Sequence, residues 1–228
     1  MQVVLNLSDS SETRSYGFNY EFHLEYTIKL TGVSLQTAIT VTNPRLVEIV
    51  EGFQCLLHTY MALPNCSSIE DVAVHGLQGS KYIDINDDML EKTETCVSRK
   101  DRDTGDFISG GVRITEPIDR IYKAGTGDLR TVAGVEVHFY REKNLKKHIS
   151  RVNIEATCSR AANTTWSGVT PSPDIVLWAP SNLEGENERT ICVKPGLVSA
   201  PIKSLVNGRM TLTQTITPEV FHERGLVC

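Results

Sequence analysis

The stretch FNYEFHLEYTIKL (residues 18–30) alternates apolar and polar side chains at every position. All of its even-numbered residues are apolar, and the odd-numbered residues between them are polar or charged. Successive side chains of a β-strand point to opposite faces of a sheet, so this pattern buries one face and solvates the other. Such regular alternation is typical of antiparallel sheets. The stretch therefore predicts one long, half-buried antiparallel strand.

The same pattern recurs along the rest of the chain. Residues 34–43 alternate again and stop before Pro44, and the Thr31-Gly32 pair marks a turn, so the two stretches predict a hairpin. Further short strands are predicted within residues 53–63, 69–84, 111–124, 134–141, 148–158, 173–180, 189–196 and 209–217, with a solvent loop over 86–110. No stretch of 12 or more residues has helical spacing. The sequence predicts a single all-β domain over residues 1–228, an antiparallel sandwich or barrel.

Composition narrows the function classes. The net charge of −5 argues against a nucleic-acid partner, because phosphate contacts need clustered basic residues. No apolar run is long enough for a membrane span, and the N-terminal residues do not form a signal peptide. The six cysteines are irregularly spaced and include no C-x-x-C pair, so we expect no zinc site and no cofactor. Reduced thiols in an intracellular compartment are the default expectation.

One histidine, His58, lies inside the apolar run FQCLLHTYMAL (residues 53–63). Two interpretations are open from the local sequence alone. The side chain is either a core histidine satisfied by one hydrogen bond or an acid or base at the floor of a ligand cleft.

The longer block FQCLLHTYMALPNCSSIEDVAVHGLQGSKYID (residues 53–84) resembles the aldose 1-epimerase, or galactose mutarotase-like, superfamily, and within it the glucose-6-phosphate 1-epimerase branch. Downstream, PIDRIYKA, SPDIVLWAP and ICVKPGLV resemble further phrases of that branch in the same order. The resemblance implies a β-supersandwich whose concave face binds a hexose or hexose phosphate. It also implies ring opening at the anomeric carbon, with a glutamate as base and a histidine as acid.

Carried over onto this sequence, the resemblance places His58 at the acid position. It makes Asp119 a substrate-contacting carboxylate, although a turn aspartate at the end of a strand is the alternative. Tyr60, in the same phrase as His58, is expected to contact substrate. An acid near neutral pKa opposite a base within about 3 Å of its proton is what concerted ring opening requires.

Two departures from the family pattern stand out. The catalytic glutamate falls on Lys194, and a protonated lysine cannot accept a proton. The arginine-bearing phrases of the family's first half are also missing, so the sandwich is expected to lack the family's first strands. The remaining basic residues near the matched motifs are Arg113, Arg120, Lys123 and Lys194. A sandwich without those strands exposes sheet edges, which favours protein partners in a larger assembly.

Three functions follow from these observations. The first is a catalytically impaired epimerase-like domain that serves as a structural or interaction subunit. The second is an active hexose-6-phosphate mutarotase with a relocated base, for which the candidates are Asp174, Glu184, Glu186 and Glu188. The third is a carbohydrate binder without catalysis, in which Trp166 and Trp178 stack on a sugar ring.

Overall fold

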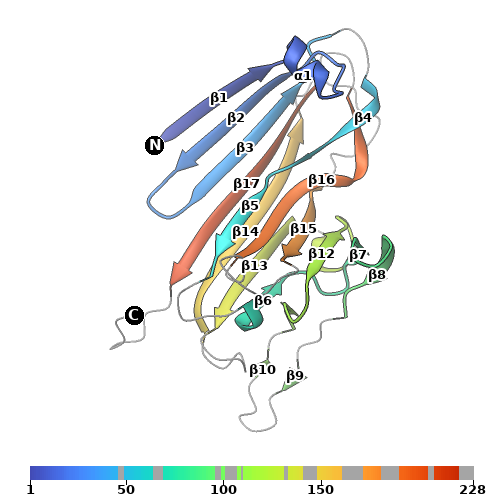
Figure 1. Cartoon of the computed structure of the whole chain (residues 1–228). Helices are drawn as coiled ribbons and strands as arrows, with labels where there is room; N and C mark the ends of the chain where they lie inside the picture. The colour runs from blue at the N-terminus through green and yellow to red at the C-terminus, as the bar shows by residue number, and fades with distance from the viewer. Residues whose placement is uncertain are drawn as a thin grey trace.

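The structure is a computed structural model in which two antiparallel β-sheets pack face to face (Figure 1). It describes residues 1–45, 49–63, 69–95, 99–100, 107–108, 110–130, 133–140, 148–160, 172–180, 190–204 and 208–220. The predicted all-β antiparallel sandwich is confirmed.

The larger sheet contains both ends of the described chain. Its eight strands, in spatial order, are β1 (Gln2–Ser8), β2 (His23–Leu30), β3 (Leu35–Thr42), β17 (Arg209–Val220), β14 (His148–Arg160), β13 (Ala133–Tyr140), β6 (Val72–His75) and β11 (Val112–Arg113). Residues from the two ends of the sequence therefore lie side by side, since β3 pairs with β17.

The second sheet holds the residues singled out by the sequence. Its strands, in spatial order, are β4 (Ile49–Leu56), β16 (Thr190–Ser204), β15 (Asp174–Ala179), β12 (Ile118–Tyr122), β7 (Lys81–Asp84) and β8 (Leu90–Thr93), and β5 (Thr59–Ala62) also pairs with β16. Outside the two sheets lie a small ribbon of β9 (Arg99–Lys100) and β10 (Phe107–Ile108), helix α1 (Ser11–Ser15), and the 3₁₀ turns η1 (Ile69–Asp71) and η2 (Gly127–Arg130).

Alternating side chains of both sheets meet in one apolar core. Val137 of β13 and Ile154 of β14 are fully buried on one side, and Leu177 of β15 and Ile191 of β16 on the other. Burying each such side chain contributes about 1.5–3 kcal/mol, so this layer holds the two sheets together. It also fixes which residues of β15 and β16 point away from the core.

The structure corrects several sequence predictions. The strand predicted over residues 18–30 begins only at His23. The rings of Phe18 and Phe22 instead meet edge to face at 5.4 Å, so aromatic packing has overridden the alternation. The predicted loop over 86–110 contains β8 and the small ribbon, and β1 was not predicted at all.

The apolar run around His58 is two strands rather than one. Strand β4 ends at Leu56 and β5 begins at Thr59, and both pair with β16. The step at Leu57 and His58 is the local feature that positions the candidate site. A single domain over residues 1–228 stays a prediction.

Candidate functional site

A row of paired residues crosses the second sheet through four strands. Asp119 of β12 lies opposite Trp178 of β15, Trp178 lies opposite Cys192 of β16, and Cys192 lies opposite Tyr60 of β5. Residues directly opposite each other in a sheet share a face. Lys194 joins this face because it is two residues beyond Cys192 on the same strand.

This face points away from the apolar core. The intervening residues Leu177, Val193 and Met61 belong to the buried cluster between the sheets. The row of Asp119, Trp178 and Tyr60 is therefore on the outer face, where a ligand can reach it.

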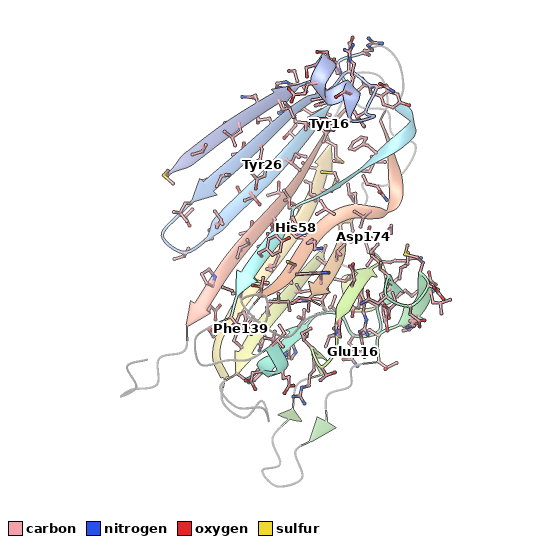
Figure 2. The ribbon with its side chains drawn as sticks, viewed as in Figure 1. Tyr16, Tyr26, His58, Glu116, Phe139 and Asp174 are labelled. Carbon is pink, nitrogen blue, oxygen red and sulfur yellow. The ribbon has the colours of Figure 1, made fainter. Side chains whose placement is uncertain are left out.

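His58 reaches the same face from the step between β4 and β5. The backbone N–H of Leu57 donates to the carbonyl oxygen of Pro195 at 2.9 Å, and the Leu57 side chain is buried. The next side chain, His58, is exposed beside β5 (Figure 2), and its ring centroid lies 4.5 Å from that of Tyr60. This exposure excludes the interpretation of His58 as a core histidine, while its role as an acid stays a prediction.

Aromatic rings surround the position that the resemblance assigns to the base. The Nζ atom of Lys194 lies 5.7 Å from the centroid of the Trp178 ring, within range of a cation–π interaction. The Tyr60 ring meets Trp178 nearly perpendicularly, at 6.4 Å between centroids. Within the described ranges, no carboxylate forms an ion pair with Lys194.

The charge of Lys194 acts on its neighbours. Partial desolvation and, secondarily, the Lys194 ammonium lower the pKa of His58 below its ordinary value. Burial raises the pKa of Asp119, and Lys194 counteracts part of that shift while Asp84 adds to it. Lys194 therefore acts electrostatically on both His58 and Asp119, and it favours the neutral form of the histidine.

The floor beneath these groups is apolar and was not identified from the sequence. Cys192 and Val176 face the same way as Lys194 and Trp178, yet both are buried. Burial raises the pKa of the Cys192 thiol to about 11. The two-residue spacing from Lys194 was the signal that could have placed Cys192 in the site.

The other basic residues named from the sequence do not gather here. Arg120 points to the opposite face, where its side chain lies 3.6 Å from carboxylate oxygens of Asp84 and Glu94 and 4.8 Å from the Tyr82 ring centroid. Lys123 pairs with Glu91, and Arg113 donates to the carbonyl oxygen of Glu70. Of the four, only Lys194 is placed close enough to His58 to lower its pKa.

The structure describes only one of the four candidates for a relocated base. Asp174, near the start of β15 (Figure 2), is 3% exposed and accepts hydrogen bonds from the backbone N–H groups of Ala124, Val198 and Ser199 and from the Ser199 hydroxyl. These four donors satisfy its carboxylate and make it a structural residue. Glu184, Glu186 and Glu188 lie outside the described residues, as does Trp166.

Among the residues that the structure describes, no group of three or more His, Cys, Asp or Glu side chains is placed to hold a metal ion. No helix in the described ranges is both long and apolar enough to cross a membrane.

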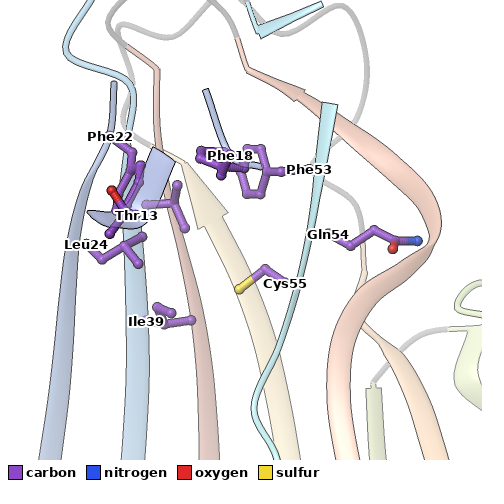
Figure 3. Close-up of a pocket in the computed structure, with 9 residues that line it drawn as sticks. Thr13, Phe18, Phe22, Leu24, Ile39, Phe53, Gln54 and Cys55 are labelled. Carbon is purple, nitrogen blue, oxygen red and sulfur yellow. The ribbon is translucent and has the colours of Figure 1, made fainter. Parts of the chain in front are cut away.

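A separate apolar pocket of about 220 Å³ lies at another place in the fold. It opens between β2, β3 and β4, and Leu24, Ile39, Phe53 and Cys55 line it together with Phe18 and Phe22 (Figure 3). None of the residues around Lys194 contributes to it.

Comparison with known proteins gives a consistent answer at the level of structure only. No protein-family model and no curated protein matches the sequence. A protein from Salmonella typhimurium described as a mutarotase superposes with a TM-score of 0.65 at 18% identity, over 96% of this chain and 61% of that one. A protein from Escherichia coli K12 described as an aldose 1-epimerase gives 0.60 at 14%, over 96% and 66%.

A galactose mutarotase-like protein from Clostridium acetobutylicum gives a TM-score of 0.61 at 15% identity, over 96% of this chain and 63% of that one. This chain thus spans between 61% and 66% of the length of these three proteins. The glucose-6-phosphate branch, the loss of the family's first strands and the roles of His58, Tyr60, Asp119 and Lys194 stay predictions. The chain has the galactose mutarotase-like fold, and the predicted resemblance is confirmed for the fold alone.

Proposed function

We propose that this protein is a catalytically impaired, mutarotase-like domain that acts as a structural or interaction subunit of a larger assembly. The observation that supports the proposal most is the ammonium of Lys194, which lies over Trp178 at 5.7 Å between His58 and Asp119. Deprotonation of an anomeric hydroxyl needs an acceptor at that position, and an ammonium has no lone pair to offer.

The acid half of the reaction is weakened as well. Desolvation and Lys194 lower the pKa of His58, so less of the imidazolium form is present at neutral pH. Loss of a general base or acid typically costs about 10²–10⁴ in rate for each. With both partners of the pair compromised, we expect turnover close to that of the uncatalysed reaction.

The phosphate specificity of the glucose-6-phosphate branch also lacks support. Arg120 and Lys123 are engaged by the carboxylates of Asp84 and Glu91, and Lys194 is the single basic residue of the four that we place near His58. A fold can keep its architecture while its site is reused for another purpose. A site without the basic residues that would bind a phosphate is consistent with an interaction role.

A second candidate is a non-catalytic carbohydrate binder. Tyr60 is 64% exposed, and its ring, with those of His58 and Trp178, forms a continuous aromatic surface flanked by Lys194 and Asp119. Pyranose rings present apolar faces that stack on aromatic side chains, and their hydroxyls pair with charged groups at the rim. The third candidate, an active hexose-6-phosphate mutarotase, would use Asp119, a carboxylate on which the Lys194 charge acts.

Two measurements test the proposal: the mass at which the chain sediments and the rate of hexose phosphate mutarotation. In an extract of the source cells, we expect the chain to sediment well above twice its own mass of 25.3 kDa. Migration at the mass of one or two chains would refute the assembly role. Nuclear magnetic resonance exchange spectroscopy on equilibrated glucose-6-phosphate should show no acceleration by the purified protein, and acceleration lost in His58→Ala would favour the third candidate instead.

Tryptophan fluorescence decides the second candidate. If hexoses bind to the aromatic surface, the emission of Trp178 should change saturably in wild-type protein and not in Tyr60→Ala. Phe18→Ala is a suitable control because Phe18 is an aromatic residue of the separate apolar pocket.

A further inference from the structure

The larger sheet extends beyond the second sheet and leaves an apolar face uncovered. In one row of paired residues, Leu212 of β17 is fully buried, Ile39 and Tyr26 are half-buried, and Leu5 of β1 is 55% exposed. All four side chains share the core-facing side, because paired residues share a face. The cover provided by the second sheet therefore ends between β17 and β1.

The terminal strand of the second sheet marks where the cover stops. Strand β4 is last in that sheet, and its Phe53 and Cys55 pack against an apolar cluster that contains Met210 of β17, as Val41 of β3 does. Figure 1 shows β1 and β2 projecting to the upper left beyond β4. The pocket of about 220 Å³ in Figure 3 lies at this boundary, between the projecting strands and β4.

The uncovered face is apolar and carries no charged side chain. On the core-facing side, β1 presents Val3, Leu5 and Leu7, which are 41%, 55% and 50% exposed, and β2 presents Leu24, Tyr26 and Ile28. The polar and charged residues of the two strands, such as Glu25 and Lys29, point to the other side. Exposed apolar surface of this extent marks an interaction site.

We propose that this face binds the same face of a second copy of the chain in a two-fold symmetric dimer. An isologous contact requires a surface that complements itself, and a neutral apolar face does so without bringing like charges together. In such a packing, β1 and β2 of each copy occupy the layer beyond β4 of the other. The two strands that end the sheets, β1 and β4, then lie side by side across the interface, which protects both edges.

The dimensions of the face set the strength of the contact. Strands β1 and β2, seven and eight residues long at about 3.3 Å per residue and about 4.8 Å apart, cover roughly 240 Å² in plan. Two such faces, even with two paired edges, stay below the roughly 1,200 Å² at the lower limit of specific interfaces. The dimer is accordingly a weak one that forms with rising protein concentration.

Sedimentation velocity on the purified chain tests the dimer. The mass should rise from 25.3 kDa toward twice that value as concentration increases through the micromolar range. Leu5→Glu places a charge in the contact and should leave a monomer at every concentration. Val4→Glu is the matched control, because Val4 is the next residue of β1, is 44% exposed and points to the opposite face, so it should dimerise as wild type does.

A wild-type chain that stays monomeric, or that assembles beyond a dimer, overturns the proposal. Equal behaviour of Leu5→Glu and Val4→Glu does so as well. Hydrogen exchange of the wild type checks the result without mutation: the amides of β1 should gain protection with concentration, and unchanged exchange there refutes the contact. None of these outcomes depends on sugar chemistry at Lys194 or on a larger assembly.

Discussion

Replacing Asp174 by alanine tests whether this carboxylate is structural. It is 3% exposed and accepts from the backbone N–H groups of Ala124, Val198 and Ser199 at 2.9, 3.0 and 2.8 Å. In Asp174→Ala these three donors lose their acceptor. Each buried unsatisfied donor costs about 1–3 kcal/mol, and partial relaxation keeps the sum below full additivity, so we expect a loss of roughly 3–5 kcal/mol in the free energy of unfolding.

Urea unfolding followed by circular dichroism measures this loss. Asp174→Asn keeps one acceptor oxygen and should lose less than the alanine variant. Asp119→Ala is the matched control, because this carboxylate is only half-buried and burial raises its pKa, so its removal should change stability by less than about 1 kcal/mol. A loss below about 1 kcal/mol in Asp174→Ala would refute the structural assignment and return Asp174 to the candidates for a catalytic base.

Three further predictions concern the face around Lys194. Lys194→Glu should raise the pKa of His58 by more than Lys194→Met does, because the neighbouring charge is reversed and not merely removed. Imidazole resonances measured against pH report this pKa. An unchanged pKa would show that the charge at position 194 does not act on His58. The raised pKa of Asp119 means that folding favours its protonated form, so this group contributes stability below its ordinary pKa of 3.8 and loses that contribution as pH rises through the shifted pKa. In urea unfolding, the free energy of unfolding of wild type should therefore fall relative to that of Asp119→Asn over this pH window. The same pH dependence in both proteins would contradict the prediction. Cys192 is fully buried with a pKa of about 11, so peptide mapping should find it alkylated at pH 8 only after unfolding, and rapid labelling of the native chain would contradict its burial.

The fold was largely predictable because the alternation pattern reflects a physical requirement. Strands such as β13 and β17 bury one face more deeply than the other, so their sequences carry the period directly. The pattern failed at residues 18–22, where the alternation continues but the aromatic rings pack on one another. The pattern also did not predict β1, because the residues of this strand are exposed on both faces.

The site was predictable only in part. The sequence showed a lysine, Lys194, at the position where the resemblance implies a glutamate. The structure brings Lys194 together with His58, Tyr60 and Asp119 on one face. Its contact with Trp178 depends on which strands become neighbours, which is decided by long-range pairing and not by local sequence. The pairing of β15 with β16 is such a case.

The engagement of Asp174 shows the same limit. Its sequence position suggested a free carboxylate near the Lys194 strand, and its carboxylate instead accepts hydrogen bonds from Val198 and Ser199 in the middle of β16. Sequence reasoning identifies residue types with the right chemistry, whereas their satisfaction by backbone donors is a property of the folded chain.

The most direct test of the central claim is the polarimetric decay of freshly dissolved α-glucose-6-phosphate in the presence of the purified protein. We expect the first-order rate to equal the spontaneous rate and to be the same for wild type and His58→Gln. A rate that rises in proportion to wild-type protein, and falls back with His58→Gln, would contradict the proposal that an ammonium at position 194 abolishes turnover.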